Sequence, residues 1–224
     1  VQTCALPMCI TMGNGDKTVV GGFGADDIDA GDAGASDYHT VIGDNGQITY
    51  NADGEAMILQ STDTTDHPEY GGDDTIDLGD GDNTVIGGMG GDTINSGVLA
   101  DGTDIILGDN GSITYAGTTG SLELSQIVST VLDDGGNDVI AMGDGDKIVV
   151  GGFGADDIDA LEGEHTVIGD NGQIDYNADG EAMVLQSTDT TINAGYGDDD
   201  AITLGNGDNT IIGGTGGNAR GFYI

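Results

Sequence analysis

The chain has 224 residues, with 3 Lys and Arg against 41 Asp and Glu, which gives a formal net charge of −38. This charge disfavours nucleic acid and anionic membrane surfaces as partners, because contacts with phosphate groups need Lys and Arg. No apolar run approaches the roughly 20 residues that a membrane-spanning helix needs. Two interpretations remain, a disordered acidic chain or a fold in which bound cations offset the acids.

The first residues of the chain differ from all that follows. The opening VQTCALPMCI contains both cysteines, Cys4 and Cys9, and shares no motif with the remaining sequence. We interpret residues 1–11 as an artefactual or non-repeat N-terminus; a short natural segment is the alternative. The body of the chain then has no cysteine, so that disulfides do not stabilise it.

Long internal repeats follow. Residues 12–30 return as 142–160 with two differences, and residues 40–65 return as 166–191, again with two. A diverged copy lies between them. The repeats predict successive units of about 64 residues, with a truncated last unit and an atypical tail. We place the boundaries at 12–68, 69–132, 133–194, 195–218 and 219–224.

A frame of nine residues runs inside each unit, and we place fourteen such windows in the chain. The fourth position is Gly in twelve windows, and the eighth is Val or Ile in thirteen. The sixth position is Asp in seven windows: Asp26, Asp74, Asp92, Asp104, Asp138, Asp156 and Asp200. A disordered polar chain has no reason to keep this phase, so the frame favours a solenoid.

The frame has a direct physical interpretation. One β-branched residue between two neighbours forms a short strand with one side chain directed inward. The six residues that follow turn the chain, and their glycines allow positive φ and a close approach of carbonyl groups to an ion. Two windows form one coil, and stacked coils align carbonyl and carboxylate oxygens in rows. Such oxygen ligands suit Ca²⁺ better than Mg²⁺, which keeps its waters.

Three windows, GGFGADDID (21–29), GGMGGDTIN (87–95) and GGFGADDID (151–159), fit the pattern GGxGxDxUx at every defined position. With the weaker windows in phase, the chain resembles the RTX family of hemolysin-type calcium-binding repeats, in particular the tandem-repeat segments of very large secreted RTX surface proteins. The resemblance implies an all-β fold, a right-handed parallel β-roll or β-helix, with calcium between successive turns. It also implies type I secretion from a bacterium and folding on contact with extracellular calcium.

The resemblance assigns calcium ligands to this chain. Asp26, Asp92 and Asp156 would bind with the carbonyl groups of their turns, at Gly21, Gly22, Gly24, Gly87, Gly88, Gly90, Gly151, Gly152 and Gly154. The looser windows add Asp74, Asp104, Asp138 and Asp200. Further candidates in the same turns are Asp80, Asp82, Asn83, Asp144, Asp146, Asp208 and Asn209. We expect roughly 8–12 calcium ions in all.

The other seven windows depart from Asp at the sixth position, and Asn83 and Asn209 supply weaker, neutral oxygen donors there. Lys17 and Lys147 place an ammonium group there, and we expect each to pair with Asp16 or Asp146 in place of an ion. His39 and His165 take the position in two other windows. A single His without Cys is more typical of a capping or packing residue than of a metal ligand.

A second motif, GDNG followed by a strand pattern, occurs once per unit. In residues 43–63 the sequence NADGEA separates two strand-like runs, which predicts one β-hairpin leaving the roll in each unit. Two interpretations of these hairpins stay open. They form a lateral contact or ligand surface, or they are decorating loops that cover the edge of the roll.

No catalytic motif is present, neither HExxH, G-x-S-x-G nor a phosphate-binding GxxxxGK[ST], so we expect no enzyme. The sequence favours a calcium-rigidified structural or adhesive segment of a secreted protein, part of a fibre or matrix, that contacts itself or neighbouring repeats. The alternative is an accessory roll of a secreted RTX enzyme or toxin. An ice-binding surface is disfavoured, because Asp27, Ile148 and Asp157 interrupt the outward row of Thr.

Overall fold

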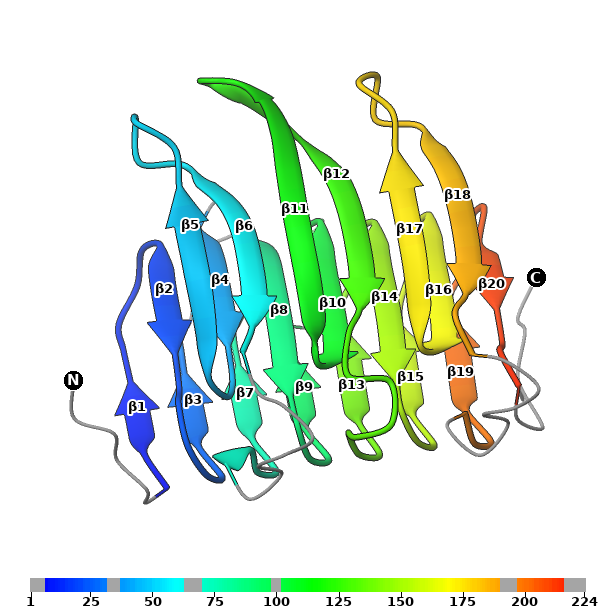
Figure 1. Ribbon diagram of the computed structural model, residues 1–224, viewed down its shortest axis with the longest axis horizontal. Helices are drawn as coiled ribbons and strands as arrows, with labels where there is room; N and C mark the ends of the chain where they lie inside the picture. The colour runs from blue at the N-terminus through cyan, green and yellow to red at the C-terminus, as the bar shows by residue number, and fades with distance from the viewer. Residues whose placement is uncertain (1–6, 32–36, 63–69, 98–101, 190–196, 216–224) are drawn as a thin grey trace.

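The computed structural model describes residues 7–31, 37–62, 70–97, 102–189 and 197–215, and every regular element in these ranges is a β-strand (Figure 1). The strands form three sheets, of which two are parallel and one is antiparallel. The described ranges contain no helix that is long and apolar enough to cross a membrane. The predicted all-β roll with hairpins is confirmed.

The two parallel sheets are built from alternating strands of the chain, so that each coil contributes one strand to each sheet. In spatial order, sheet A consists of β1 (Cys9–Thr11), β3 (Asp27–Asp29), β7 (Thr75–Asp77), β9 (Thr93–Asn95), β13 (Val139–Met142), β15 (Asp157–Ala160) and β19 (Ala201–Leu204). Sheet B consists of β2 (Lys17–Val20), β4 (Tyr38–Ile42), β8 (Asp82–Gly88), β10 (Asp104–Asp109), β14 (Lys147–Gly152), β16 (His165–Asp170) and β20 (Thr210–Ile212). Equivalent positions of the nine-residue frame stack on one another, as Ile28 does on Ile76 and Ile76 on Ile94.

The eighth position of the frame fills the space between sheets A and B. Its Val and Ile side chains form one buried cluster with a few apolar neighbours. Ile28 and Ile94 from sheet A and Val85 and Ile106 from sheet B have no exposed surface. This thin core is the one that the sequence predicted.

The hairpins form the third sheet. Hairpins β5 (Gly46–Tyr50)–β6 (Ala56–Ser61), β11 (Gly111–Thr118)–β12 (Ser121–Ser129) and β17 (Gly172–Tyr176)–β18 (Ala182–Ser187) follow strands β4, β10 and β16. Each is inserted where the chain would otherwise turn directly from sheet B to sheet A. The hairpins also pair with one another, β6 with β11 and β12 with β17, which makes a continuous antiparallel sheet C (Figure 1). Each hairpin therefore bonds its unit to the next.

Sheet C packs on the outer face of sheet B through a second buried core. Ile86 and Leu107 from sheet B meet Leu59, Ile113 and Ile127 from sheet C, all with no exposed surface. Sheet B is thus the middle layer of three. The sequence interpretation that the hairpins cover the edge of the roll is wrong, because they cover a face.

The N-terminal segment that the sequence set apart contributes to the roll. Strand β1 pairs in register with β3, which places Ile10 on Ile28. Cys9–Thr11 therefore supplies a strand of sheet A, although it lacks the glycine signature of the repeats. Residues 1–6 and the proposed tail 219–224 lie outside the described residues.

Candidate metal-binding edge

Aspartates from six coils form one row along the edge where the chain passes from sheet B to sheet A. Each precedes a strand of sheet A, and the in-register pairing of these strands stacks the aspartates coil upon coil. All are at most 4% exposed. We call this row the aspartate ladder: Asp26, Asp74, Asp92, Asp138, Asp156 and Asp200.

One carboxylate oxygen of each ladder residue binds the neighbouring coil. The backbone N–H of Asp26 donates to Oδ1 of Asp74 at 2.7 Å, and that of Asp92 donates to Oδ1 of Asp138 at 2.7 Å. The same bond recurs along the row at 2.7–3.0 Å, and Met8 donates it to Asp26 at the first coil. These bonds fix the orientation of the carboxylates, because each charged acceptor is bound to a rigid backbone donor.

In five of the six ladder residues, the other carboxylate oxygen is buried without a hydrogen-bond donor among the described residues. Within the described residues, Oδ2 has no hydrogen-bond partner in Asp26, Asp92, Asp138, Asp156 and Asp200. An ionised oxygen in such a position is destabilising unless a proton or a cation compensates it. The ladder therefore presents a row of oxygen atoms that calls for positive charge.

A row of glycines faces these oxygens. A Cβ atom added to Gly87 would overlap Oδ2 of Asp92 and the carbonyl oxygen of Gly108. A Cβ atom on Gly151 would likewise overlap Oδ2 of Asp156 and the carbonyl oxygen of Gly169. Each of these rungs thus brings a carboxylate oxygen close to the carbonyl oxygen of the next coil, and any side chain larger than Gly would fill the space.

Burial and mutual repulsion act on the protonation of the ladder. Burial raises the pKa of Asp138 to about 8 and, with the charge of Asp138 adding to it, that of Asp156 to about 9. Burial also raises the pKa of Asp200 to about 7, and it raises that of Asp92 well above the usual range. The folded chain thus favours neutralised carboxylates at this edge.

The donor set fits calcium. All the facing atoms are carboxylate or carbonyl oxygens, which are the ligands that Ca²⁺ prefers. In the described part of the chain, no group of three or more Asp, Glu, His or Cys side chains could hold a metal ion. Any site at this edge must therefore combine ladder carboxylates with backbone carbonyl groups.

The structure adds a set of residues that the sequence analysis missed. The aspartates of the GDNG motifs, Asp44, Asp109 and Asp170, are buried beside the ladder. Asp109 accepts hydrogen bonds from the backbone N–H groups of Gly136, at 3.0 Å, and of Phe153. Asp109 thereby connects the turn before β13, at Gly136, to the turn after β14, at Phe153. The threefold recurrence of GDNG was the signal that could have identified these residues.

The predicted glycines take distinct places in the same turns. Gly21, Gly87 and Gly151 face the ladder, whereas Gly88 and Gly152 lie against Asp44 and Asp109 with φ of 128°. Gly22, Gly24, Gly90 and Gly154 also have positive φ, which permits the sharp turn.

The opposite edge, where the chain passes from sheet A to sheet B, is different. The sixth frame position holds there Lys17, His39, Asn83, Asp104, Lys147, His165 and Asn209. The seventh predicted aspartate, Asp104, thus lies apart from the other six. Its Oδ2 forms an ion pair with Lys147 at 3.0 Å, and its Oδ1 accepts hydrogen bonds from Asn83.

The remaining predicted ligands belong to this second edge as well. Asp82 accepts the backbone N–H of Thr103 at 2.8 Å, and Asp146 accepts that of Glu164 at 2.9 Å. Asp144 accepts the backbone N–H of Glu162, Asn209 accepts that of His165, and Asp80 and Asp208 lie in equivalent turns. The structure does not gather these side chains with the ladder.

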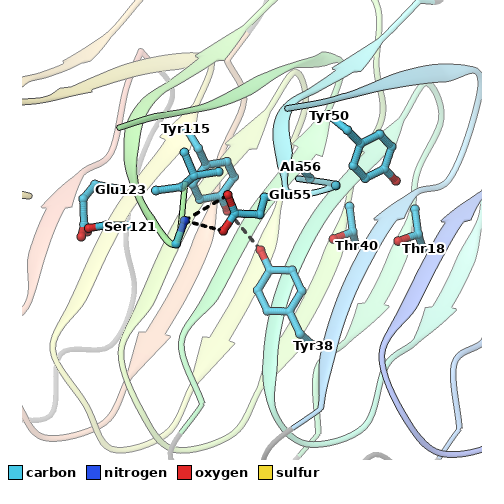
Figure 2. Close-up of a pocket in the computed structure, with 12 residues that line it drawn as sticks. Thr18, Tyr38, Thr40, Tyr50, Glu55, Ala56, Tyr115, Ser121 and Glu123 are labelled. Carbon is cyan, nitrogen blue, oxygen red and sulfur yellow. Dashed lines mark hydrogen bonds between the residues drawn. The ribbon is translucent and has the colours of Figure 1, made fainter. Parts of the chain in front are cut away.

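A cavity of about 660 Å³ lies under the tips of the first two hairpins (Figure 2). The tip of β11–β12 contacts that of β5–β6, where the backbone N–H of Gly120 donates to Glu55 at 2.9 Å. The hydroxyl groups of Tyr38 and Tyr115 each form a hydrogen bond of 2.9 Å with Thr84 Oγ1. The contact between the two hairpin tips thus closes one side of the cavity. No ladder residue lines it.

Fold and site together define a three-layered parallel β-roll with an acidic, glycine-lined edge. No family model matches the chain, and neither a curated protein nor a solved structure matches it.

Proposed function

We propose that this chain is a calcium-binding structural or adhesive segment of a secreted repeat protein, which folds and stiffens when it meets extracellular calcium. The observation that carries the proposal is the row of buried Oδ2 atoms in the aspartate ladder, which in Asp26, Asp92, Asp138, Asp156 and Asp200 have no hydrogen-bond donor among the described residues. Calcium would be held by ladder carboxylates and by carbonyl groups of the facing glycine turns.

The proposed mechanism is electrostatic. A chain with a formal net charge of −38 repels itself when it compacts, and the ladder concentrates carboxylates in a dry row. Divalent cations between the coils offset this repulsion, and their binding free energy becomes folding free energy. Sequestration of the chain from calcium before secretion would then keep it unfolded.

The layered architecture supports a mechanical role. Every coil hydrogen-bonds to the next in sheets A and B, and sheet C adds bonds between the hairpins of successive units. A solenoid of this kind gains stability from each neighbouring interface. Contacts with neighbouring repeats of the same protein, or with a second copy, are part of the proposal.

The test is a calcium titration of the EDTA-treated protein followed by far-UV circular dichroism, with magnesium at equal concentrations as control. We expect a cooperative gain of β signal with calcium alone, because carboxylate and carbonyl oxygens suit Ca²⁺, whereas Mg²⁺ keeps several of its waters. A full β signal in EDTA at neutral pH would overturn calcium-coupled folding. An unchanged coil signal at millimolar calcium would do the same for this chain.

A further inference from the structure

The sixth frame position carries different side chains at the two edges of the roll. At the first edge it holds the six ladder carboxylates. At the second edge, the described rungs hold two ammonium groups, two imidazoles, two amides and the carboxylate of Asp104. The strands place these rungs in register, Asn83 on Asp104, Asp104 on Lys147 and Lys147 on His165. One frame therefore builds two chemically different rows.

The ammonium group of Lys147 lies where a cation would lie. It is 1% exposed, and it donates to the carbonyl oxygens of Gly102 and Asp144, both at 2.7 Å. Its third contact is the ion pair with Asp104 Oδ2 at 3.0 Å. A carboxylate and two turn carbonyls from neighbouring coils are the same donor types that face one another at the ladder.

Asp104 has no capacity left for a metal ion. Its Oδ1 accepts from the backbone N–H and from Nδ2 of Asn83, at 3.1 and 2.9 Å, and its Oδ2 accepts from Ser96 Oγ at 2.7 Å besides Lys147. The sequence prediction that Lys147 pairs with Asp146 is wrong. The reason is that the Lys147 side chain is buried and reaches Gly102 and Asp104 of the preceding coil, whereas Asp146 is exposed and accepts the backbone N–H of Glu164.

We propose that Lys147 is a built-in counter-ion that replaces a bound metal ion, so that calcium binds along the aspartate ladder and not in the row of side chains at the second edge. Lys17 takes the equivalent position at the first coil, where its half-buried ammonium group donates to two carbonyl oxygens of its own turn, those of Asn14, at 2.9 Å, and Gly15. This inference deepens the proposed function, on which it rests for the metal count.

A consequence is that the two edges respond differently to calcium removal. The second edge keeps its neutralising charge, because an ammonium group on the chain cannot be removed by a chelator. The first edge loses its charge compensation. The expected number of ions then falls below the roughly 8–12 that sites at both edges would give.

The test is the number of calcium ions bound per chain, measured by equilibrium dialysis and elemental analysis, for the wild type and for Lys147→Asp. This substitution removes the ammonium group and places a second carboxylate beside Asp104, as at the ladder. We expect an additional bound calcium ion and a higher calcium concentration at the folding midpoint. Lys147→Gln and Thr203→Asp are the controls, since one only removes the charge and the other adds a carboxylate on the exposed face of β19.

An additional ion in Lys147→Asp, and in neither control, supports the proposal. An unchanged ion count in Lys147→Asp, or an equal gain in Thr203→Asp, overturns it. If neither the wild type nor any variant binds calcium, the proposed function fails. The role of Lys147 is then tested by a second readout, the effect of substitutions on the free energy of unfolding.

That readout is a double-mutant cycle of Lys147→Met and Asp104→Asn in urea unfolding, done in the condition in which the wild type is folded. Lys147→Met alone should lower the folding equilibrium constant roughly 100-fold or more, because it leaves a buried charge unpaired. The double variant should recover a large part of this loss. Strictly additive effects would overturn the counter-ion role, whether or not calcium binds.

Discussion

Asp138 accepts the backbone N–H of Asp92 at 2.7 Å through Oδ1, while its Oδ2 is buried with no hydrogen-bond donor among the described residues and faces Gly108. One carboxylate thus stabilises the stacking of two coils and also introduces a charge that the fold does not compensate. The two oxygens can be separated experimentally, because an amide keeps the first function and removes the charge.

Asp138→Asn should therefore have opposite effects with and without calcium. In EDTA the variant should be more stable than the wild type at neutral pH, by about 1–3 kcal/mol, because the buried carboxyl must take up a proton on folding, whereas an amide is neutral already. In saturating calcium it should bind fewer ions and gain less stability. Urea unfolding in both conditions, with a calcium count, measures the two effects.

Asp159→Asn is the matched control for this prediction. The substitution removes the same charge, but from the exposed face of β15. Equal effects of the two substitutions would show that only the net charge of the chain matters. A variant Asp138→Asn with the calcium count of the wild type would contradict the ladder as the binding edge.

The metal-free protein should be stabilised by acid. Burial raises the pKa of Asp138 to about 8 and that of Asp156 to about 9, against an ordinary value of 3.8 in the unfolded chain. A raised acid pKa means that the folded state binds more protons, so stability is complete below the unfolded pKa and is lost as pH rises through the folded one. In EDTA, stability should thus fall between about pH 4 and 9.

Far-UV circular dichroism and urea unfolding at pH 5, 7 and 9 in EDTA check this dependence. Protons and calcium compete for the same oxygens, so the affinity of the folded protein for calcium should fall on acidification. The double variant Asp138→Asn/Asp156→Asn should show a flatter pH profile. Higher metal-free stability at pH 9 than at pH 5 would refute the account.

The repeat frame predicted the roll and the ladder, because both depend on single positions of a strict period. Ile94 at the eighth position and Asp92 at the sixth lie where the frame put them. The same frame could not separate the two edges, since it treats alternate windows as equivalent. Asp104 was therefore grouped with the ladder, although it lies at the opposite edge.

The middle layer was missed for a related reason. Strands of sheet B have a second apolar residue after the inward one, as in Val85–Ile86 and Val149–Val150, whereas β3 and β9 of sheet A have Asp29 and Asn95 there. Apolar side chains on both faces are typical of a strand that is covered twice. The sequence alone could therefore predict that sheet B is covered on both faces. Which segment covers the second face could not be predicted, because it depends on where the hairpins pack.

The contact between sheets B and C should contribute strongly to stability. Ile127 on β12 is fully buried in the second core, next to strands of sheet B. Ile127→Ala should lower the free energy of unfolding in calcium by about 2–5 kcal/mol, because it leaves a cavity between two rigid sheets. Met183→Ala on β18, where the side chain is 68% exposed, should change it by less than about 0.5 kcal/mol. Hairpins that only decorate the roll would give equally small effects for both.

The close approach at the glycine row provides the last prediction. A methyl group at residue 151 would overlap the carbonyl oxygen of Gly169 and Oδ2 of Asp156, which are the atoms that we propose to face calcium. Gly151→Ala should therefore cost about 1–3 kcal/mol of stability in calcium, and it should also lower the number of bound ions. Gly13→Ala is the control, because no atom lies within 4 Å of the added Cβ position there. A loss of stability in Gly151→Ala with an unchanged ion count would mean that the glycine row is needed for packing alone and that calcium binds elsewhere.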